Sequence, residues 1–352
     1  MKKRVTIHDI ARKLNTTAST VSRALQDHPR ISKEMRRKVQ QTAREMNYRP
    51  DEMAVNLRKR QRNILGVIVP QVDRHFFARV IRGIEEEAGK QGYHILIGQS
   101  YEQVEREVHL LEKMGKGVVE GLLISVSLQT KNYEHIQRLI RQEVPLVFFD
   151  RVPEEISADS VVIDDYDAAF RVTEHIIHSG CRNLAHFAGP SHINIYRERS
   201  NGFLAAMNQY HLVINTDWML NNVLTREAGY KAMEFLWRNR KKPDAIVSSG
   251  DYSALGALLW CKENKISIPG QMCITGFANE PFTSLITPGM TSVEQHGFEM
   301  GKKAASLLLE RVQGKYTGKE VRRVIIPSEV LIRESSARAK NEIKEKQTNH
   351  HK

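Results

Sequence analysis

Short apolar runs alternate with longer amphipathic segments along most of the chain, from residue 64 onward. The apolar runs predict buried strands at 64–69, 93–98, 121–125, 145–150, 161–163, 183–188 and 245–249. Apolar residues at helical spacing predict helices near 76–91, 102–115, 131–142, 166–179, 197–210, 226–239 and 252–264. This alternation predicts parallel sheets with helices on both faces. About 270 residues is large for a single sheet and fits two lobes.

The first 48 residues have a different pattern, with two short amphipathic segments separated by a polar turn at Asn15 and Thr16. Asn tolerates the left-handed conformation that such a turn needs. Thr6 and Thr17 are suited to cap the two helices. The apolar residues predicted to face inward are Ile7, Ile10, Ala11, Leu14, Val21 and Leu25. Two helices joined in this way predict a helix-turn-helix, whose second helix enters the major groove of DNA.

A third helix is predicted after Ser32, which can cap it. Its inward residues are Met35, Val39, Ala43 and Met46, and its opposite face is basic enough to lie beside phosphates. The helix should end before Pro50, because the residue before a proline is disfavoured in the helical conformation. Pro50 can itself open a further short helix that extends to Leu57.

Nearly all of the net positive charge lies in this N-terminal segment. Residues 1–62 contain 17 Lys and Arg against 6 Asp and Glu, which gives +11 of the +12 carried by the whole chain. A basic block followed by a near-neutral body indicates that one end of the chain binds a polyanion and that the rest has another role.

These residues carry a family resemblance. The segment TIHDIARKLNTTASTVSRAL resembles the helix-turn-helix of the LacI/GalR family of bacterial transcription regulators, and residues 47–57 are similar to the segment that follows it there. The similarity continues to about residue 335. It implies an all-α helix-turn-helix headpiece and an α/β, two-lobed, periplasmic-binding-protein-like core with parallel sheets and helices on both faces.

The resemblance also implies a division of the chain. The expected parts are a DNA-binding domain (1–48), a hinge helix or linker (49–62) and an effector-binding core (63–335). Residues 336–352 are polar and charged with little apolar content, so we expect a disordered tail there. Within the core, lobe 1 would contain about 63–163 and 292–326, and lobe 2 about 164–291 and 327–335.

For the headpiece, the resemblance implies that Ala18, Ser19 and Arg23 contact bases, and Arg23 is suited to guanine. Leu57 would wedge into the minor groove, although it could instead pack on its own core. The full set of implied DNA-binding residues is Thr6, Thr17, Ala18, Ser19, Ser22, Arg23, Arg30, Tyr48, Ala54 and Leu57. Because one headpiece binds weakly at cellular salt, we expect a homodimer on a pseudo-palindromic double-stranded DNA operator. One departure from the family pattern is Val55, where Arg is usual.

For the core, ligands of parallel sheets bind beyond the carboxyl ends of the strands, where the loops here supply aromatic, hydroxyl and charged groups. The resemblance implies an effector, a sugar or sugar derivative, bound between the lobes. The implied binding residues are Phe76, Phe77, Ser125, Arg151, Asp164, Arg199, Asp251 and Asn279. Other roles stay open: Arg199 in a surface ion pair, Asp251 as a helix cap, and one of the two Phe rings in the core. The core departs from the family at Arg74-His75, Gly250 and Ala278.

No secretory signal or long apolar segment is found, so we expect a cytoplasmic protein without a membrane partner. Cys181, Cys261 and Cys273 lack the spacing of a metal site, and we predict no metal, cofactor or catalytic residue. The predicted function is a transcription regulator, a repressor by family habit, controlled by a small-molecule effector. Two alternatives remain: an enzyme that uses Asp150, Asp164 and Asp251, or a constitutive dimeric DNA-binding protein without an effector.

Overall fold

The computed structural model describes residues 5–48, 62–238, 240–318 and 320–338. The chain divides into two compact units, Met1–Arg62 and Asn63–Lys352. We call the described part of the first unit the headpiece and that of the second the core.

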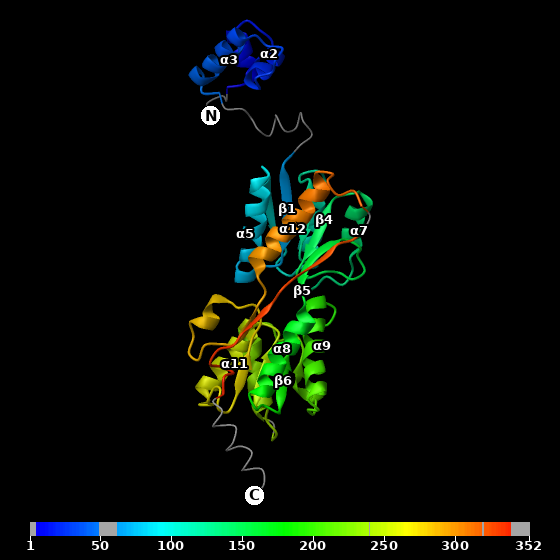
Figure 1. Ribbon diagram of the computed structural model, residues 1–352, viewed down its shortest axis with the longest axis vertical. Coiled ribbons are helices and arrows are strands. Elements are labelled where there is room, and N and C mark those ends of the chain that lie inside the picture. Colours follow the sequence, from blue (N-terminus) through cyan, green and yellow to red (C-terminus); the bar gives the residue numbers. More distant parts are fainter. Residues whose placement is uncertain (1–4, 49–61, 239, 319, 339–352) are drawn as a thin grey trace. The chain divides into compact units, whose positions relative to one another are not determined.

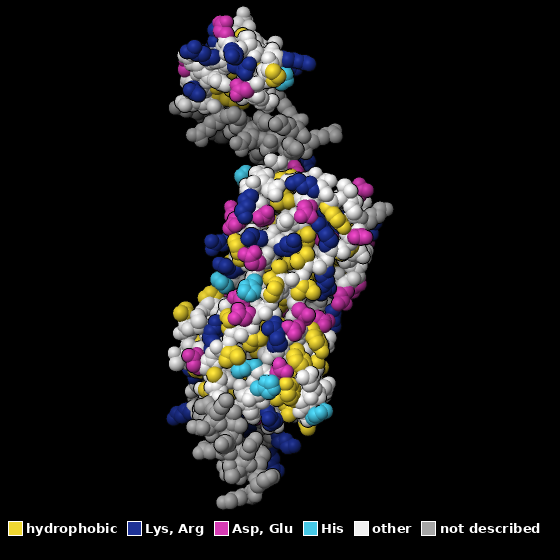
Figure 2. Space-filling model, in the orientation of Figure 1, with side chains coloured by type: hydrophobic (Ala, Val, Ile, Leu, Met, Phe, Trp, Pro, Cys, Tyr) yellow, Lys and Arg dark blue, Asp and Glu magenta, His cyan; other side chains and the backbone are white. Residues whose placement is uncertain are grey.

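The headpiece is a bundle of three helices, as the sequence predicted. These are α1 (Ile7–Lys13), α2 (Ala18–Leu25) and α3 (Lys33–Glu45). They enclose a small core made of Ile10, Ala11, Val21, Ala24, Val39 and Ala43. Lys and Arg side chains are prominent on the headpiece in Figure 2, whereas both signs of charge are interspersed over the visible face of the core.

Lobe 1 of the core is built on a six-stranded parallel sheet. In spatial order its strands are β11 (Arg323–Ile326), β5 (Asp159–Ile163), β4 (Leu146–Phe149), β3 (Gly121–Ile124), β1 (Ile64–Val69) and β2 (His94–Gln99). Helices α5 (His75–Lys90) and α12 (Gly297–Val312) pack together on one face (Figure 1). Helices α6 (Val104–Gly115) and α7 (Glu134–Arg141) bury their apolar residues on the other face. The predicted parallel sheet with helices on both faces is confirmed.

Lobe 2 is built on a smaller parallel sheet. Its strands, in order, are β7 (Met219–Leu220), β6 (Leu184–Phe187), β8 (Ala245–Ser248) and β9 (Cys273–Thr275). Two helix pairs pack around it: α8 (Asp165–His178) with α9 (Asn194–Gln209), and α10 (Arg226–Arg238) with α11 (Asp251–Glu263). Two short 3₁₀ helices, η1 (Thr216–Trp218) and η2 (Pro281–Ser284), complete the lobe.

The lobes are joined by three passages of the chain, which follow β5, β10 (Ser292–Glu294) and β11. Strand β10 pairs in antiparallel fashion with β12 (Glu329–Leu331). Strand β11 pairs with β5, and β12 pairs with β10. These two strands near the C-terminus therefore do not pair with each other. All three described cysteines are buried and unbridged.

Two expectations from the sequence need correction. The apolar run at 93–98 was predicted to be a buried strand, but β2 is the edge strand of its sheet, where Leu96 is 39% and Ile97 43% exposed. The tail was predicted to start at residue 336. Ser336 is instead fully buried, and its hydroxyl hydrogen-bonds with that of Thr291 at 2.6 Å.

Close packing of α5 on α12 depends on glycine. A Cβ atom at Gly83 would lie 2.1 Å from the Phe298 carbonyl oxygen, and one at Gly301 would lie 2.0 Å from the Val80 carbonyl oxygen. Such distances leave no room for a side chain, so these two glycines let the helix backbones approach each other. Together, α5 and α12 cover one face of the lobe 1 sheet.

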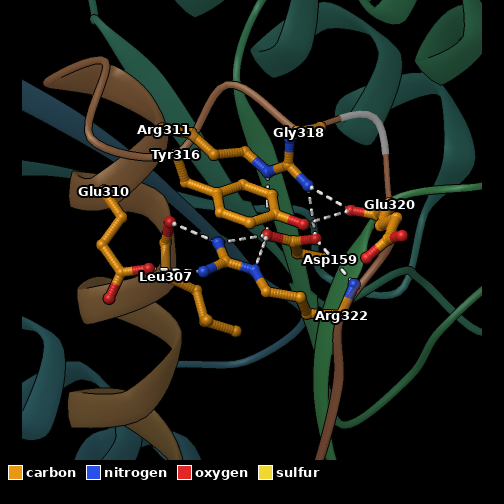
Figure 3. Close-up of polar contacts among 8 residues, drawn as sticks. All are labelled: Asp159, Leu307, Glu310, Arg311, Tyr316, Gly318, Glu320 and Arg322. Atoms are coloured by element: carbon orange, nitrogen blue, oxygen red, sulfur yellow. Dashed lines mark hydrogen bonds and ion pairs between the residues drawn. The ribbon is translucent and has the colours of Figure 1, made fainter.

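A buried polar cluster fixes the opposite end of α12 (Figure 3). The fully buried Asp159 carboxylate at the start of β5 accepts hydrogen bonds from Arg311 at 2.6 and 2.8 Å and from Arg322 at 2.7 and 3.1 Å. The Tyr316 ring lies against both guanidinium groups. Arg322 also pairs with Glu310 of α12. The cluster ties α12, the loop after it and β11 to β5.

Candidate functional site

The helix-turn-helix is built from local signals. The Asp9 carboxylate accepts hydrogen bonds from both the Thr6 hydroxyl and the Thr6 N–H, and these bonds cap the start of α1. Asn15 has a left-handed backbone with φ of 45°, as predicted for the turn. The Thr17 hydroxyl then accepts the Thr20 N–H and caps α2. The turn at Asn15 and the cap at Thr17 thus determine where the second helix begins.

The surface of α2 presents part of the predicted DNA-binding set. Ser19 and Arg23 are exposed, whereas Ala18 and Ser22 are half-buried. The guanidinium groups of Arg23 and exposed Arg30 make no hydrogen bond or ion pair with any other residue that the structure describes. Both are therefore available to a ligand.

The remaining predicted DNA contacts are placed less directly. Thr6 and Thr17 are helix caps. Tyr48 packs partly against the headpiece core. Ala54 and Leu57 lie outside the described residues.

In the core, a cavity of about 250 Å³ lies at the carboxyl ends of the strands, between the lobes. From lobe 1 it is lined by Gln71, Arg74, Phe76, Phe77, Glu102, Leu128, Asp150 and Arg151. From lobe 2 it is lined by Ile195, Tyr196, Arg199, Leu224, Thr225, Ser249, Gly250, Asp251, Tyr252, Phe277, Ala278 and Glu280. Gln295, in a connection between the lobes, completes it. The structure therefore brings together Phe76, Phe77, Arg151, Arg199 and Asp251 of the predicted set.

On the lobe 1 side, Arg151 is held by Glu102. Its two terminal nitrogens donate to the two Glu102 oxygens at 2.7 and 3.2 Å. The Asp150 carboxylate lies 3.9 Å from the Arg151 Nε atom, which is buried without a hydrogen-bond partner. Burial raises the pKa of Asp150, although the nearby guanidinium groups oppose this shift. Asp150 has a φ of 60°, so the backbone is strained where this carboxylate is presented.

On the lobe 2 side, Arg199 is held by Asp165. Its Nε and Nη2 atoms both lie 2.8 Å from the same Asp165 oxygen, and its Nη1 atom donates to the Ser249 carbonyl at 2.9 Å. The guanidinium group stacks on the Phe277 ring with 3.6 Å to the centroid. Burial raises the pKa of Asp165 to about 7, against the opposing effect of Arg199. Arg199 thus forms a buried ion pair with Asp165 and also lines the cavity, so the alternative of a surface ion pair is wrong.

Asp251 is the first residue of α11, which is capped by Gly250 and not by Asp251 itself. The carboxylate accepts the Ser292 hydroxyl at 2.6 Å and the Glu280 N–H at 2.7 Å. Burial raises the pKa of Asp251 to about 7. The carboxylate therefore links α11 to Ser292 of β10 and to Glu280 just before η2. The predicted alternative, in which Asp251 only caps the helix, is wrong.

Three residues of the predicted effector set do not line the cavity. Asp164 is exposed and caps α8 by accepting the Asp167 N–H, so its neighbour Asp165 takes the buried position. Ser125 is fully buried beside Asp150. Asn279 turns away because its amide donates to Glu294 at 2.7 Å.

Sequence reasoning missed several lining residues. Tyr196 and Gln295 are the clearest cases: among the residues that the structure describes, the Tyr196 hydroxyl and the Gln295 side-chain amide have no hydrogen-bond partner. Tyr196 lies three positions before Arg199 on α9, so helical spacing was a usable signal. Gln295 lies in a connection whose place between the lobes is set only by the tertiary fold.

Neither a metal-binding cluster nor a membrane-spanning helix is found in the part of the chain that the structure describes. No group of three or more His, Cys, Asp or Glu side chains among them is arranged to hold a metal ion. None of the described helices is both long and apolar enough to span a membrane.

Residues 6–51 match the model of bacterial regulatory proteins of the lacI family, and residues 173–336 match that of a periplasmic binding protein-like domain. The chain is 30% identical over 331 residues to the HTH-type transcriptional repressor CytR of Escherichia coli K12. This alignment covers 94% of this chain and 96% of that protein. It is 30% identical over 317 residues to catabolite control protein A of Priestia megaterium, with 90% and 93% covered. Such relatives are transcription regulators and not enzymes, which confirms the prediction that this chain is not an enzyme.

The fold is shared with solved structures of transcription regulators. The lac repressor dimer bound to operator and the anti-inducer ONPF matches with a TM-score of 0.83 and 20% identity, over 95% of this chain and 99% of that one. A complex of the transcriptional regulator CelR with cellobiose matches with a TM-score of 0.71 and 24% identity, over 94% and 100%. The expected combination of a helix-turn-helix headpiece and a periplasmic-binding-protein-like core is confirmed.

Proposed function

Because the chain belongs to the LacI family of bacterial regulatory proteins, we propose that this transcriptional repressor binds a pseudo-palindromic DNA operator as a homodimer, controlled by a small molecule bound between its lobes. The observation that carries the proposal is the cavity of about 250 Å³ that is lined from both lobes. A ligand there contacts both lobes at once, and it shifts their arrangement if it binds one arrangement better than another.

The cavity favours a sugar or sugar derivative. Aromatic rings of Phe77 and Tyr196 offer apolar faces, and the Tyr196 hydroxyl, the Gln295 amide and the Asp150 carboxylate offer polar groups. A few polar groups that converge on a concave, largely apolar lining are typical of a small-molecule site. The related CelR is described in complex with cellobiose, which supports this class of ligand.

Operator binding is assigned to α2. We propose that Arg23 contacts a guanine and that Ser19 contacts a neighbouring base, because both side chains are exposed on this helix. Arg30, with its unpaired guanidinium group, would contact phosphate. Since operator DNA lies in the bacterial cytoplasm, we place the protein there.

The edge strand β2 supports the homodimer. Leu96 and Ile97 expose apolar surface on an unpaired sheet edge, which soluble proteins usually cover or pair. The lac repressor structure is described as a dimer on its operator. Leu96→Lys should therefore shift the sedimentation coefficient of the full chain towards that of a monomer.

The proposal is tested on DNA selected from a randomised pool by the full-length chain. The selected sites should contain an inverted repeat, and Arg23→Ala should weaken binding to them. Adding sugars and nucleosides should then reveal a compound that changes operator affinity. If compounds bind the core but operator affinity never changes, the protein is instead a constitutive dimeric DNA-binding protein.

A further inference from the structure

The charged groups at the cavity are unequal in number. Five carboxylates line or adjoin it, against three guanidinium groups. The carboxylates belong to Glu102, Asp150, Asp165, Asp251 and Glu280. The guanidinium groups belong to Arg74, Arg151 and Arg199. With all groups ionised, the cavity would carry a surplus of negative charge before any ligand arrives; burial raises the pKa of Asp150, Asp165, Asp251 and Glu280, which reduces that surplus near neutral pH.

The two deepest guanidinium groups are already neutralised by the protein. Arg151 is held by both oxygens of Glu102, and Arg199 by Asp165 and the Ser249 carbonyl. Arg151, Arg199 and Asp165 are each about 5% exposed or less. An anionic ligand would have to displace a carboxylate to form the paired contacts by which Arg holds phosphate or carboxylate groups.

The other cationic positions at the cavity are also engaged. The Arg74 guanidinium group lies 3.8 Å above the Tyr252 ring and donates to Gln71 at 2.7 Å. A helix N-terminus is the usual alternative site for a phosphate. At the N-terminus of α5, however, the Glu280 carboxylate already lies close enough to the His75 N–H for this group to lower the pKa of Glu280, against the larger effect of burial.

Within the described ranges of the chain, two carboxylates accept no hydrogen bond from a cationic group. The nearest cationic nitrogen to Asp150 is the Arg151 Nε atom at 3.9 Å, and both hydrogen bonds that Asp251 accepts come from uncharged donors. Burial has raised the pKa of both groups. An anion placed beside them would raise these pKa values further, so that its binding would be coupled to the uptake of protons. A hydroxyl group, by contrast, can donate to Asp150 with no charge to compensate.

We propose that this cavity excludes anions, so that the effector is an uncharged polyhydroxyl compound, such as a free sugar or nucleoside, and not a phosphorylated or acidic one. This inference rests on the proposed function. Glu102 and Asp165 are then specificity-determining residues, because they occupy the two guanidinium groups that would otherwise bind a phosphate.

The test uses the full-length chain and thermal unfolding at constant ionic strength. Matched pairs are compared: glucose with glucose 6-phosphate, galactose with galactose 6-phosphate, and adenosine with adenosine 5′-phosphate. The expected result is that each phosphorylated compound binds at least tenfold more weakly than its neutral partner. Inorganic phosphate is also titrated into the wild type and into Arg151→Gln. Phosphate bound by the basic headpiece affects both proteins equally, so a difference in their phosphate-dependent unfolding temperature reports binding in the cavity. We expect no difference.

Variants then reverse the exclusion. Glu102→Gln frees Arg151 and should gain a phosphate-dependent rise in unfolding temperature that the wild type lacks. Asp165→Asn frees Arg199 and is the second variant if the first does not fold. Asp164→Asn is the matched control, because this exposed residue lies outside the cavity and Asn can retain its capping role. It should gain nothing.

Two results would overturn the inference. One is a phosphorylated compound that binds the wild type more tightly than its neutral partner and loses this advantage in Arg151→Gln. The other is the absence of any gain of phosphate binding in both folded charge variants. If such a phosphorylated compound also changes operator affinity, the proposed function stands and only the exclusion of anions fails. If ligands bind as expected but none changes operator affinity, the proposed function fails instead.

Discussion

Replacing Asp159 by Asn should destabilise the core by about 3 kcal/mol at neutral pH. Asp159 is the carboxylate on which Arg311 and Arg322 converge (Figure 3). Removing one partner of a buried ion pair costs about 3–5 kcal/mol because it leaves a buried charge uncompensated. We take the lower end, because the two Arg side chains are 22% and 23% exposed and Glu310 still pairs with Arg322. For a unit of this size, about 3 kcal/mol lowers the unfolding temperature by roughly 6–12 °C.

The destabilisation caused by Asp159→Asn should become smaller at low pH. Burial alone would raise the pKa of Asp159, but hydrogen bonds from Arg311 and Arg322 outweigh it and lower the pKa below its usual value. A carboxylate with a lowered pKa in the folded state stabilises the protein above its unfolded pKa, near 4, and loses this contribution as pH falls through the folded value. The difference between wild type and Asp159→Asn should therefore be full at pH 7 and shrink below pH 4.

The assay is thermal unfolding of the full chain followed by far-ultraviolet circular dichroism at pH 7 and pH 3.5. Asp164→Asn is the control, since it removes a carboxylate of the same type from an exposed position. The reasoning is refuted if Asp159→Asn unfolds within 1 °C of this control at pH 7. It is equally refuted if the destabilisation is as large at pH 3.5 as at pH 7.

Three further predictions address the headpiece, the helix packing and the cavity. Arg23→Ala should weaken operator binding by about 1–3 kcal/mol and relax the preference for guanine at one position of each half-site; equal weakening on all sequences in anisotropy titrations would assign Arg23 to phosphate. Gly83→Ala should lower the unfolding temperature of the core, because the added Cβ would lie 2.1 Å from the Phe298 carbonyl oxygen; an unchanged temperature would show that the helices separate at no cost. Asp251→Asn should become more stable relative to wild type as pH rises from 5 to 7.5. Burial raises the pKa of Asp251 to about 7, so the folded state keeps a proton that the unfolded chain has released, and its contribution falls by up to about 1.4 kcal/mol per pH unit; a stability difference that is constant or shrinks over this range would contradict the assignment.

The sequence predicted the headpiece and the strand–helix order of the core because both depend on local signals. Thr6, Asn15 and Thr17 act where short-range capping and turn preferences place them. The apolar run that became β1 was predicted at its observed bounds, 64–69. Helix α12 was not predicted, although its glycine contact with α5 is a main element of lobe 1.

The cavity was predicted less well because its residues come from distant segments. Asp164 and Asp165 are adjacent acids, and only the start of α8 decides which one is exposed and which one pairs with Arg199. The exposure of Leu96 on β2 also has no local signal, because an edge strand and a buried strand carry the same apolar run. Sheet order, which is a tertiary property, made the difference.

The central claim is that a ligand between the lobes and the operator at the headpiece are coupled. The most direct measurement is the affinity of one neutral ligand for the free full-length chain and for the chain saturated with operator DNA, by isothermal titration calorimetry. Coupling is reciprocal, so the ratio of these affinities must equal the factor by which the ligand changes operator affinity. We predict a ratio that differs from one by at least about fivefold, in the usual range of allosteric coupling. Equal ligand affinities with and without operator would contradict the account.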